Sequence, residues 1–247
     1  MPPALPPAVA VMAKVPGMSP VKSRLHAALT AERATELYRC FLLDRLDAIA
    51  RLEDVSPVVA FTPEDAEHVM RGLAPAGFEL VPQRGGDLGQ RLSALLTALV
   101  ERGHAGAIAL DSDSPTLPMA YVADAAKVLA GGRCDVALGP CEDGGYYLVG
   151  LRSPQPALFE GIPWSTDAVF AMTLDKARAR GLSVHVLPRW FDVDTEGDLR
   201  RLNADLTAGH HGPQRTYAFL RQLNEPVIAV PRPGVTRGTA AGKGRRP

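Results

Sequence analysis

Short apolar runs alternate with amphipathic stretches along most of this chain, and this alternation constrains the fold more than any other feature. Residues 8–13 read AVAVMA, a continuous apolar run typical of a strand buried on both faces. Over residues 31–52 apolar side chains recur at helical spacing, directly after the N-cap residue Thr30. Strands that alternate with helices predict a mostly parallel sheet with helices on both faces.

The same alternation continues to about residue 202. Further strands are predicted at 57–61, 78–82, 106–111, 135–140, 146–151 and 182–188. Further helices are predicted after Thr62-Pro63 and at 87–103, 119–132, 165–181 and 195–202. A Gly-Gly pair separates 135–140 from 146–151, which favours a turn between these strands over another crossover. We therefore expect a single three-layer α/β/α, Rossmann-like domain.

The two ends of the chain differ in composition from this region. Residues 1–7 are proline-rich, and residues 226–247 form a basic tail rich in Gly, Pro and Arg. Such segments have too few periodic apolar residues to build a core, so both are predicted to be disordered. The expected domain therefore covers residues 8–225.

Charge and cysteine content argue against several classes of protein. The 27 basic and 27 acidic residues balance, so the whole molecule has no bias toward nucleic acid or anionic membranes. No run approaches the roughly 20 apolar residues of a membrane helix, and the start does not resemble a signal peptide. Three scattered cysteines are too few for a disulfide framework. We expect a cytoplasmic protein without nucleic-acid or membrane partners.

A basic loop, residues 13–25 (AKVPGMSPVKSRL), follows the first predicted strand. Its prolines and Gly17 prevent regular structure, yet Lys14, Lys22 and Arg24 lie within eleven residues. Ligands of parallel sheets bind beyond the carboxyl ends of the strands, so these cations are placed to contact an anion. Lys22 and Arg24, two apart, would share one side of an extended segment. The alternative is a solvated basic loop; the spacing of a P-loop is absent.

Two aspartate pairs also follow predicted strands. Asp111 and Asp113 end the strand at 106–111, and in extended geometry their carboxylates would face the same way. Asp192 and Asp194 form a second D-x-D pair. Neighbouring carboxylates repel unless a cation lies between them, and Mg²⁺ or Mn²⁺ shared with phosphates suits this need. The alternative is that the aspartates cap turns and helices.

Two further stretches offer binding groups. Gly85-Gly86 and Asp87 open a helix that carries Arg91, a pattern that could cradle phosphate; an ordinary exposed arginine is the alternative. A glycine turn and a tryptophan loop offer carboxylates, close approach of the backbone and aromatic faces that could bind an acceptor. The alternative is a tight turn beside aromatic residues of the core. The candidate acceptor residues are Glu142, Asp143, Gly144, Gly145, Tyr146, Trp164 and Ser165.

Other catalytic signatures are missing from the sequence. It contains no H-E-x-x-H metal-ligand pair, no G-x-S-x-G nucleophile elbow and no G-x-G-x-x-G after the first strand. The glycine-rich AAGKGRR of residues 240–246 lies in the tail and precedes no predicted helix. These absences argue against a zinc protease, a serine hydrolase and a dinucleotide enzyme.

Several motifs together resemble a known family. They occur in order over residues 8–202: MAKVPGMSPVKSRL, GGDLGQRL, DSDSPTLP, LGPCEDGGYYLVGL, PWSTDAV and FDVDTEGDL. They resemble the radical-SAM/selenodomain-associated transferase family, a GT-A-like group with the nucleotide-diphospho-sugar transferase fold. A more distant resemblance is to 2-phospho-L-lactate guanylyltransferase. The resemblance implies that Lys22 and Arg24 contact phosphates and that Asp113 and Asp194 hold the metal. That family usually has a small residue in place of Asp111, so the resemblance implies that Asp113 is the main ligand and Asp111 an auxiliary one.

Two transferase activities fit these features. In the first, an anionic small-molecule acceptor attacks a nucleoside triphosphate and pyrophosphate leaves, with Lys22, Arg24 and Asp113 as the catalytic residues. In the second, a glycosyltransferase uses a nucleotide-sugar, with Glu142 or Asp143 as base. The excess cations of the basic loop favour the first, because a departing pyrophosphate carries more charge. A non-catalytic nucleotide-binding protein is a third alternative. The sequence leaves open whether the protein forms a homodimer.

Overall fold

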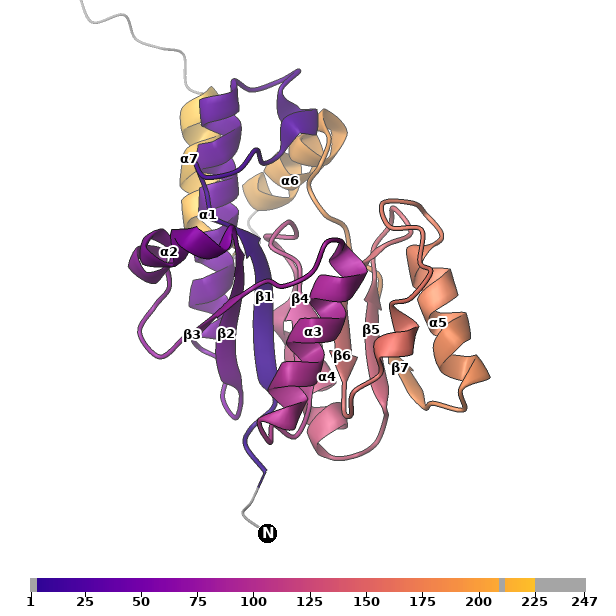
Figure 1. Ribbon diagram of the computed structural model, residues 1–247. Helices are drawn as coiled ribbons and strands as arrows, with labels where there is room; N and C mark the ends of the chain where they lie inside the picture. Colours follow the sequence, from indigo (N-terminus) through magenta and orange to yellow (C-terminus); the bar gives the residue numbers. More distant parts are fainter. Residues whose placement is uncertain (1–3, 209–211, 225–247) are drawn as a thin grey trace, which may run out of the picture.

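The computed structural model describes residues 4–208 and 212–224, and its central element is one seven-stranded sheet (Figure 1). The strands are β1 (Ala8–Lys14), β2 (Ser56–Thr62), β3 (Glu79–Pro82), β4 (Ala107–Leu110), β5 (Val136–Pro140), β6 (Tyr146–Leu151) and β7 (Val184–Val186). Their order across the sheet is β3-β2-β1-β4-β6-β5-β7. Only β6 runs antiparallel to its neighbours. The predicted mostly parallel sheet is confirmed, including the turn between β5 and β6.

The helices begin close to the predicted caps. They are α1 (Ala31–Ile49), α2 (Glu67–Leu73), α3 (Leu88–Glu101), α4 (Met119–Ala130), α5 (Val169–Ala179), α6 (Glu196–Thr207) and α7 (Gln214–Asn224). Thr30 caps α1, and Thr195 forms a capping box with Asp198 at α6. Pro63 does not start α2, because a 3₁₀ turn (Glu64–Ala66) comes first. Helix α7 has no counterpart among the predicted elements.

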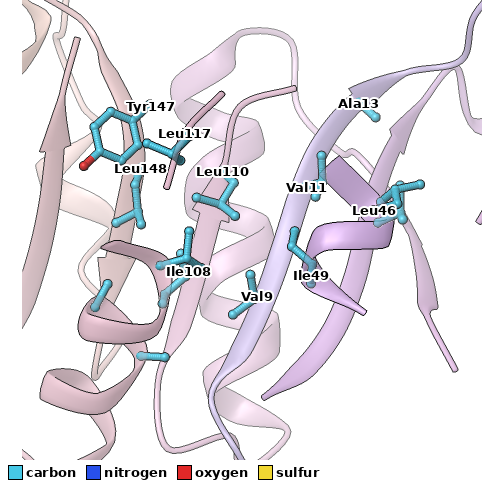
Figure 2. Packing of buried hydrophobic residues seen from close by; sticks show 14 of the residues in the cluster. Val9, Val11, Ala13, Leu46, Ile49, Ile108, Leu110, Leu117, Tyr147 and Leu148 are labelled. Atoms are coloured by element: carbon cyan, nitrogen blue, oxygen red, sulfur yellow. The ribbon is translucent and has the colours of Figure 1, made fainter. Parts of the chain in front are cut away.

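Two hydrophobic clusters cover the two faces of the sheet. Alternate residues of β1 point in opposite directions, so Val9 and Val11 join one cluster and Ala8 and Ala10 the other. Helices α1, α2 and α4 pack on the first face and α3 and α5 on the second. Figure 2 shows the first cluster, with Leu46 of α1 beside the valines of β1. The expected three layers are therefore present.

A third cluster lies beyond the carboxyl ends of the strands. It joins Leu25 of the basic loop, Phe41 of α1, Val193 of the second aspartate pair, Leu202 of α6 and Phe219 of α7. Figure 1 shows the upper part of α1 grouped with α6 and α7 above the sheet, while the rest of α1 runs down along the strands. Two of the chemically interesting loops are thus anchored in one small core.

The chain ends differ in part from the sequence prediction. Leu5 pairs with the loop before β4: its N–H donates to Gly103 O (2.9 Å) and its carbonyl accepts from Ala105 N–H (2.9 Å). Described residues of the segment predicted to be disordered are therefore held against the sheet by backbone hydrogen bonds. The predicted basic tail, residues 226–247, lies outside the described residues.

The structure bears on two expectations from the sequence, which concern a disulfide framework and a membrane helix. All three cysteines, at 40, 134 and 141, are buried and free. Among the helices of the described ranges, none combines the length and apolar character needed to cross a membrane.

Replacing Leu46 tests the first cluster. Leu46 is fully buried, so Leu46→Ala should lower the free energy of unfolding by about 2–5 kcal/mol through lost burial and a residual cavity. Urea denaturation measures it. The matched control, Leu88→Ala at a position that is 45% exposed, should change stability by no more than about 0.5 kcal/mol. Equal losses in the two variants would contradict this packing.

Candidate active site

A cleft of about 670 Å³ opens where the sheet topology reverses. Strand β1 is followed by β2 on one side, whereas β4 pairs with β1 on the other side. Such a switch point leaves a crevice at the carboxyl ends of the strands, where ligands bind in open α/β sheets. The loops after β1, β3 and β4 line the cleft, together with Asp194. Its charged lining residues are Lys14, Lys22, Arg24, Asp87, Arg91, Asp111, Asp113 and Asp194.

Lys22 bridges the two aspartate pairs. Its Nζ lies 2.7 Å from Asp113 Oδ1 and 2.9 Å from Asp194 Oδ1. The lysine side chain is only 2% exposed, whereas the two carboxylates are 38% and 37% exposed. Burial alone would lower the pKa of this ammonium, but the charges of Asp113 and Asp194 outweigh it and raise the pKa. Two carboxylates from distant segments thus converge on one cation.

Backbone contacts bring these segments together. The Val193 N–H donates to Asp113 O over 3.0 Å, which ties the second aspartate pair to the first. Val193 is fully buried in the third cluster. Its neighbour Asp194 lines the cleft, whereas Asp192, on the other side in sequence, is not among the lining residues. Leu25, also fully buried there, anchors the basic loop.

The basic loop reaches the carboxylates by a conformation that differs from the prediction. Lys22 has φ 50° and ψ 37°, in the left-handed region, and a 3₁₀ turn (Ser23–Leu25) follows. The expected extended segment is therefore wrong, although Lys22 and Arg24 still approach the same residue: Arg24 Nη1 lies 3.9 Å from Asp194 Oδ2. Ser165, with φ 66°, also lines the cleft. Non-glycine residues in this region are often held there at functional sites.

Asp111 and Asp113 have different partners. Asp113 pairs with Lys22, whereas Asp111 Oδ2 accepts a hydrogen bond from Ser114 Oγ over 2.7 Å. Burial raises the pKa of Asp111 to about 6; the Arg45 guanidinium opposes this rise and the Asp113 carboxylate adds to it. The two side chains therefore have different hydrogen-bond and ion-pair partners within the same cleft.

Several residues of the cleft escaped the sequence reasoning. Tyr38 Oη accepts from the Lys14 N–H (3.0 Å) and lies 3.0 Å from Ser112 Oγ. Gln83 Nε2 donates to Ala13 O (3.2 Å) and to the carbonyl of residue 60 (2.7 Å). Gln83 directly follows a strand, so the positional criterion used for the aspartates could have found it. Tyr38 carries no such signal, because it occupies an ordinary inward position of an amphipathic helix.

The glycine loop before α3 uses several of its polar groups internally. The Gly86 N–H donates to Gln90 Oε1 (2.9 Å), and Asp87 Oδ1 accepts from Gln90 N–H (2.7 Å) as the N-cap of α3. Arg91 Nε donates to Gly85 O (3.0 Å). Gly86, Asp87 and Arg91 all line the cleft. Gly17 lies in the exposed part of the basic loop, with φ 82°.

The predicted acceptor residues are not gathered at the cleft; Ser165 is the member of that set that lines it. Glu142 forms a two-pronged ion pair with Arg201 (2.7 and 3.1 Å), and this hydrogen bonding lowers the pKa of Glu142. Asp143 Oδ1 accepts from the Gly145 N–H (2.8 Å) within the turn. These contacts give Glu142, Asp143 and Gly145 structural tasks.

Three other members of that set also pack within the fold. Gly144 has φ 91°, and a Cβ there would lie 2.1 Å from Asp167 O, so the turn requires glycine. The Tyr146 and Trp164 rings meet edge to face, 6.4 Å apart. Trp164 also covers Gly89 of α3. The turn and the tryptophan loop therefore brace each other.

A second group of potential metal ligands lies beside the cleft. Cys141, Asp143 and Asp192 each offer one ligand atom, and these atoms lie within 4.8 Å of one another. The pKa of Asp192 is raised to about 7, mainly by burial and then by the negative charges of Asp143, Asp194 and Asp111. Asp192 thus belongs with this group, whereas Asp194 belongs with Lys22.

Comparison with known proteins supports the fold class. A crystal structure from Desulfovibrio desulfuricans G20, provisionally described as a nucleotide-diphospho-sugar transferase, shares 32% identity with this chain. The match covers 88% of this chain and 95% of that one, with a TM-score of 0.81. The model of a family described as uncharacterized proteins conserved in bacteria (DUF2064) matches residues 45–166. The chain therefore belongs to one family with the Desulfovibrio protein, and its α/β fold is that of nucleotide-diphospho-sugar transferase structures.

More distant structures share the fold at low identity. CMP:2-keto-3-deoxy-manno-octonic acid synthetase, complexed with CTP, shows 12% identity over 82% of this chain and 99% of its own, with a TM-score of 0.52. The 4-diphosphocytidyl-2C-methyl-D-erythritol synthase of Anaerococcus prevotii DSM 20548 shows 12% identity over 81% and 96%, with a TM-score of 0.53. No curated protein matches this chain. The resemblances to the radical-SAM-associated transferases and to the guanylyltransferase stay predictions.

The pKa of Asp192 makes a prediction about stability and pH. Because folding raises this pKa from 3.8 to about 7, the folded protein binds more protons than the unfolded chain between these values. Stability should therefore fall as pH rises through this window. Asp192→Asn removes the contribution, so the variant should lose less stability than the wild type between about pH 5 and pH 8. Urea denaturation at the two pH values measures the difference.

The exposed Asp65 provides the control for this comparison. Asp65→Asn should reproduce the wild-type profile, since Asp65 does not face the cluster of acids. An Asp192→Asn protein that loses as much stability as the wild type would contradict the assigned environment of Asp192.

Proposed function

We propose that the protein is a divalent-metal-dependent nucleotidyltransferase that joins a nucleoside triphosphate to a small anionic acceptor and releases pyrophosphate. The observation that carries the proposal is the convergence of Lys22, Asp113 and Asp194 in the switch-point cleft, with Arg24 and Arg91 on its rim. Cations suit a triphosphate, and carboxylates suit the metal that accompanies it. The CTP-bound synthetase of the same fold agrees with this class of substrate.

The proposed residue roles follow from position and charge. An acceptor oxygen attacks the α-phosphorus, the bond from that phosphorus to the bridging oxygen breaks, and the electron pair leaves with pyrophosphate. Lys22 and Arg24 neutralise the charge that develops on the leaving group. Arg91, whose Nε donates to Gly85 O, contributes a further positive charge near the N-terminus of α3. The catalytic set is therefore Lys22, Arg24 and Asp113.

Two carboxylates meet the main requirement of a metal site. Asp113 and Asp194 already converge on one cation, the Lys22 ammonium, and both are open to the cleft. Oxygen ligands of this kind suit Mg²⁺ or Mn²⁺. When bound, the ion would supply positive charge to the phosphates. The lysine would then exchange carboxylate contacts for phosphate contacts.

Glycosyl transfer from a nucleotide-sugar is the second candidate, favoured by the provisional description of the Desulfovibrio relative. It calls for a carboxylate base near the acceptor. The structure weakens one expected base, because Glu142 is engaged by Arg201 and its lowered pKa makes it a poorer proton acceptor. A non-catalytic nucleotide-binding protein would bind the same ligands without turnover.

A thermal-shift panel distinguishes these functions. The full chain is heated with each nucleoside triphosphate and with nucleotide-sugars, each with and without Mg²⁺, because a ligand that binds the folded state raises the melting temperature. We expect the largest rise with one triphosphate plus Mg²⁺. A larger rise with a nucleotide-sugar would overturn the first choice. Binding without pyrophosphate release, across a screen of anionic acceptors, would favour the non-catalytic alternative.

Variants of the basic loop test the phosphate contacts. Lys22→Met and Arg24→Ala should each weaken triphosphate binding by about tenfold or more, which corresponds to about 1.4 kcal/mol. Isothermal titration calorimetry measures the affinity. Arg84→Ala is the control, since Arg84 is an exposed arginine that pairs with Glu64 and does not line the cleft. Unchanged affinity in both loop variants would contradict the proposed contacts.

A further inference from the structure

A buried arginine beneath the cleft has no place in the proposed chemistry. Arg45 lies on α1, its residue is 2% exposed, and it is among the largest fully enclosed side chains. A guanidinium in such surroundings is costly unless an opposite charge and hydrogen bonds compensate it. The burial accordingly lowers the pKa of Arg45, and Asp111 is the strongest opposing charge.

The direct contact of Arg45 is with the loop that carries the first aspartate pair. Its guanidinium donates to Ser114 O, while its Nε has no hydrogen-bond partner among the described residues. Asp113, the other acid that interacts with Arg45, is already paired with Lys22. No direct ion pair joins Arg45 to Asp111 among the described residues, so the charge on Asp111 balances Arg45 across Ser114, which both side chains contact.

Asp111 contacts the same serine from the other side. Ser114 Oγ donates to Asp111 Oδ2, and Asp111 Oδ1 is enclosed without a hydrogen-bond partner in the described structure. The Asp111 N–H donates to Tyr147 O over 2.9 Å, which fixes the start of the loop to β6. Arg45 thus holds the carbonyl of Ser114, and Asp111 holds its hydroxyl. Asp113, which lies between Asp111 and Ser114 in the sequence, pairs with Lys22.

We propose that Asp111 is the buried counter-ion of Arg45, and that together they position the loop that presents Asp113. In this arrangement Asp111 and Arg45 are positioning residues, and Asp111 is not a ligand of the metal. Lys22 then compensates the charges of Asp113 and Asp194, and Arg45 compensates the charge of Asp111. The part that concerns the metal rests on the proposed function, whereas the pairing of charges does not.

A double-mutant cycle tests the pairing without any ligand. Arg45→Met, Asp111→Asn and the double variant are unfolded with urea in metal-free buffer. Asn keeps an oxygen that accepts from Ser114, so it removes the charge alone. We expect each single variant to lower the urea midpoint, because it leaves one buried charge unpaired, and the double variant to recover part of the loss.

An arginine on the same helix provides the matched control. Arg39 is partly exposed and pairs with Glu36, so Arg39→Met combined with Asp111→Asn should shift the midpoint by the sum of the single shifts. Additive shifts for the Arg45 pair as well would overturn the proposal.

Metal binding tests the assignment of roles. Mn²⁺ titration by calorimetry compares the full-length wild type with Asp113→Asn, with Arg45→Met and with the Arg45→Met/Asp111→Asn double variant. We expect Asp113→Asn to lose about tenfold or more in affinity. Because a positioning residue acts through the Asp113 loop, adding Asp111→Asn to Arg45→Met should weaken Mn²⁺ binding no further than Arg45→Met does alone. A further loss of about tenfold on adding Asp111→Asn would make Asp111 a ligand and overturn the proposal. If Asp113→Asn binds Mn²⁺ like the wild type, the metal site of the proposed function fails, while the Arg45–Asp111 coupling stands or falls by the cycle.

Discussion

The ion pairs of Lys22 with Asp113 and Asp194 are the interaction on which the candidate site depends. The carboxylates of Asp113 and Asp194, 81 positions apart in the sequence, would repel each other without a cation between them. The ammonium is almost fully enclosed, so its attraction to the two acids is screened less than on the surface. The third hydrophobic cluster supplies the framework: Leu25 and Val193 anchor the lysine loop and the second aspartate pair in the same small core. Packing therefore decides where the charges meet.

The sequence predicted the fold well because its strands leave a strong local signal. Residues 8–13 are apolar without interruption, and the structure places them inside the sheet, between β2 and β4, and covered on both faces. Caps such as Thr30 and Thr195 act within a few residues of themselves, which is why they could be recognised. Pro63 misled the prediction of α2, because a proline fits the 3₁₀ turn that precedes the helix as well as its first position.

The site was predicted less completely, because its detail depends on contacts between distant segments. The rule that ligands bind at the carboxyl ends of strands located the basic loop and both aspartate pairs. The division of labour within each pair could not be read from spacing: Asp113 and Asp194 share Lys22, whereas Asp111 and Asp192 have other surroundings. The acceptor prediction rested on composition alone, and Glu142 turned out to be paired with Arg201, a residue on a helix 59 positions away.

The central claim is that Asp113 and Asp194 hold a metal while Lys22 and Arg24 face a triphosphate. The most direct measurement is a crystal structure of the full chain with Mn²⁺ and a non-hydrolysable nucleoside triphosphate, with the ion located by its anomalous scattering. We predict the manganese peak at the carboxylates of Asp113 and Asp194, with the phosphates against Lys22 and Arg24. A peak held by Cys141, Asp143 and Asp192, with Lys22 still between its two aspartates, would contradict this arrangement.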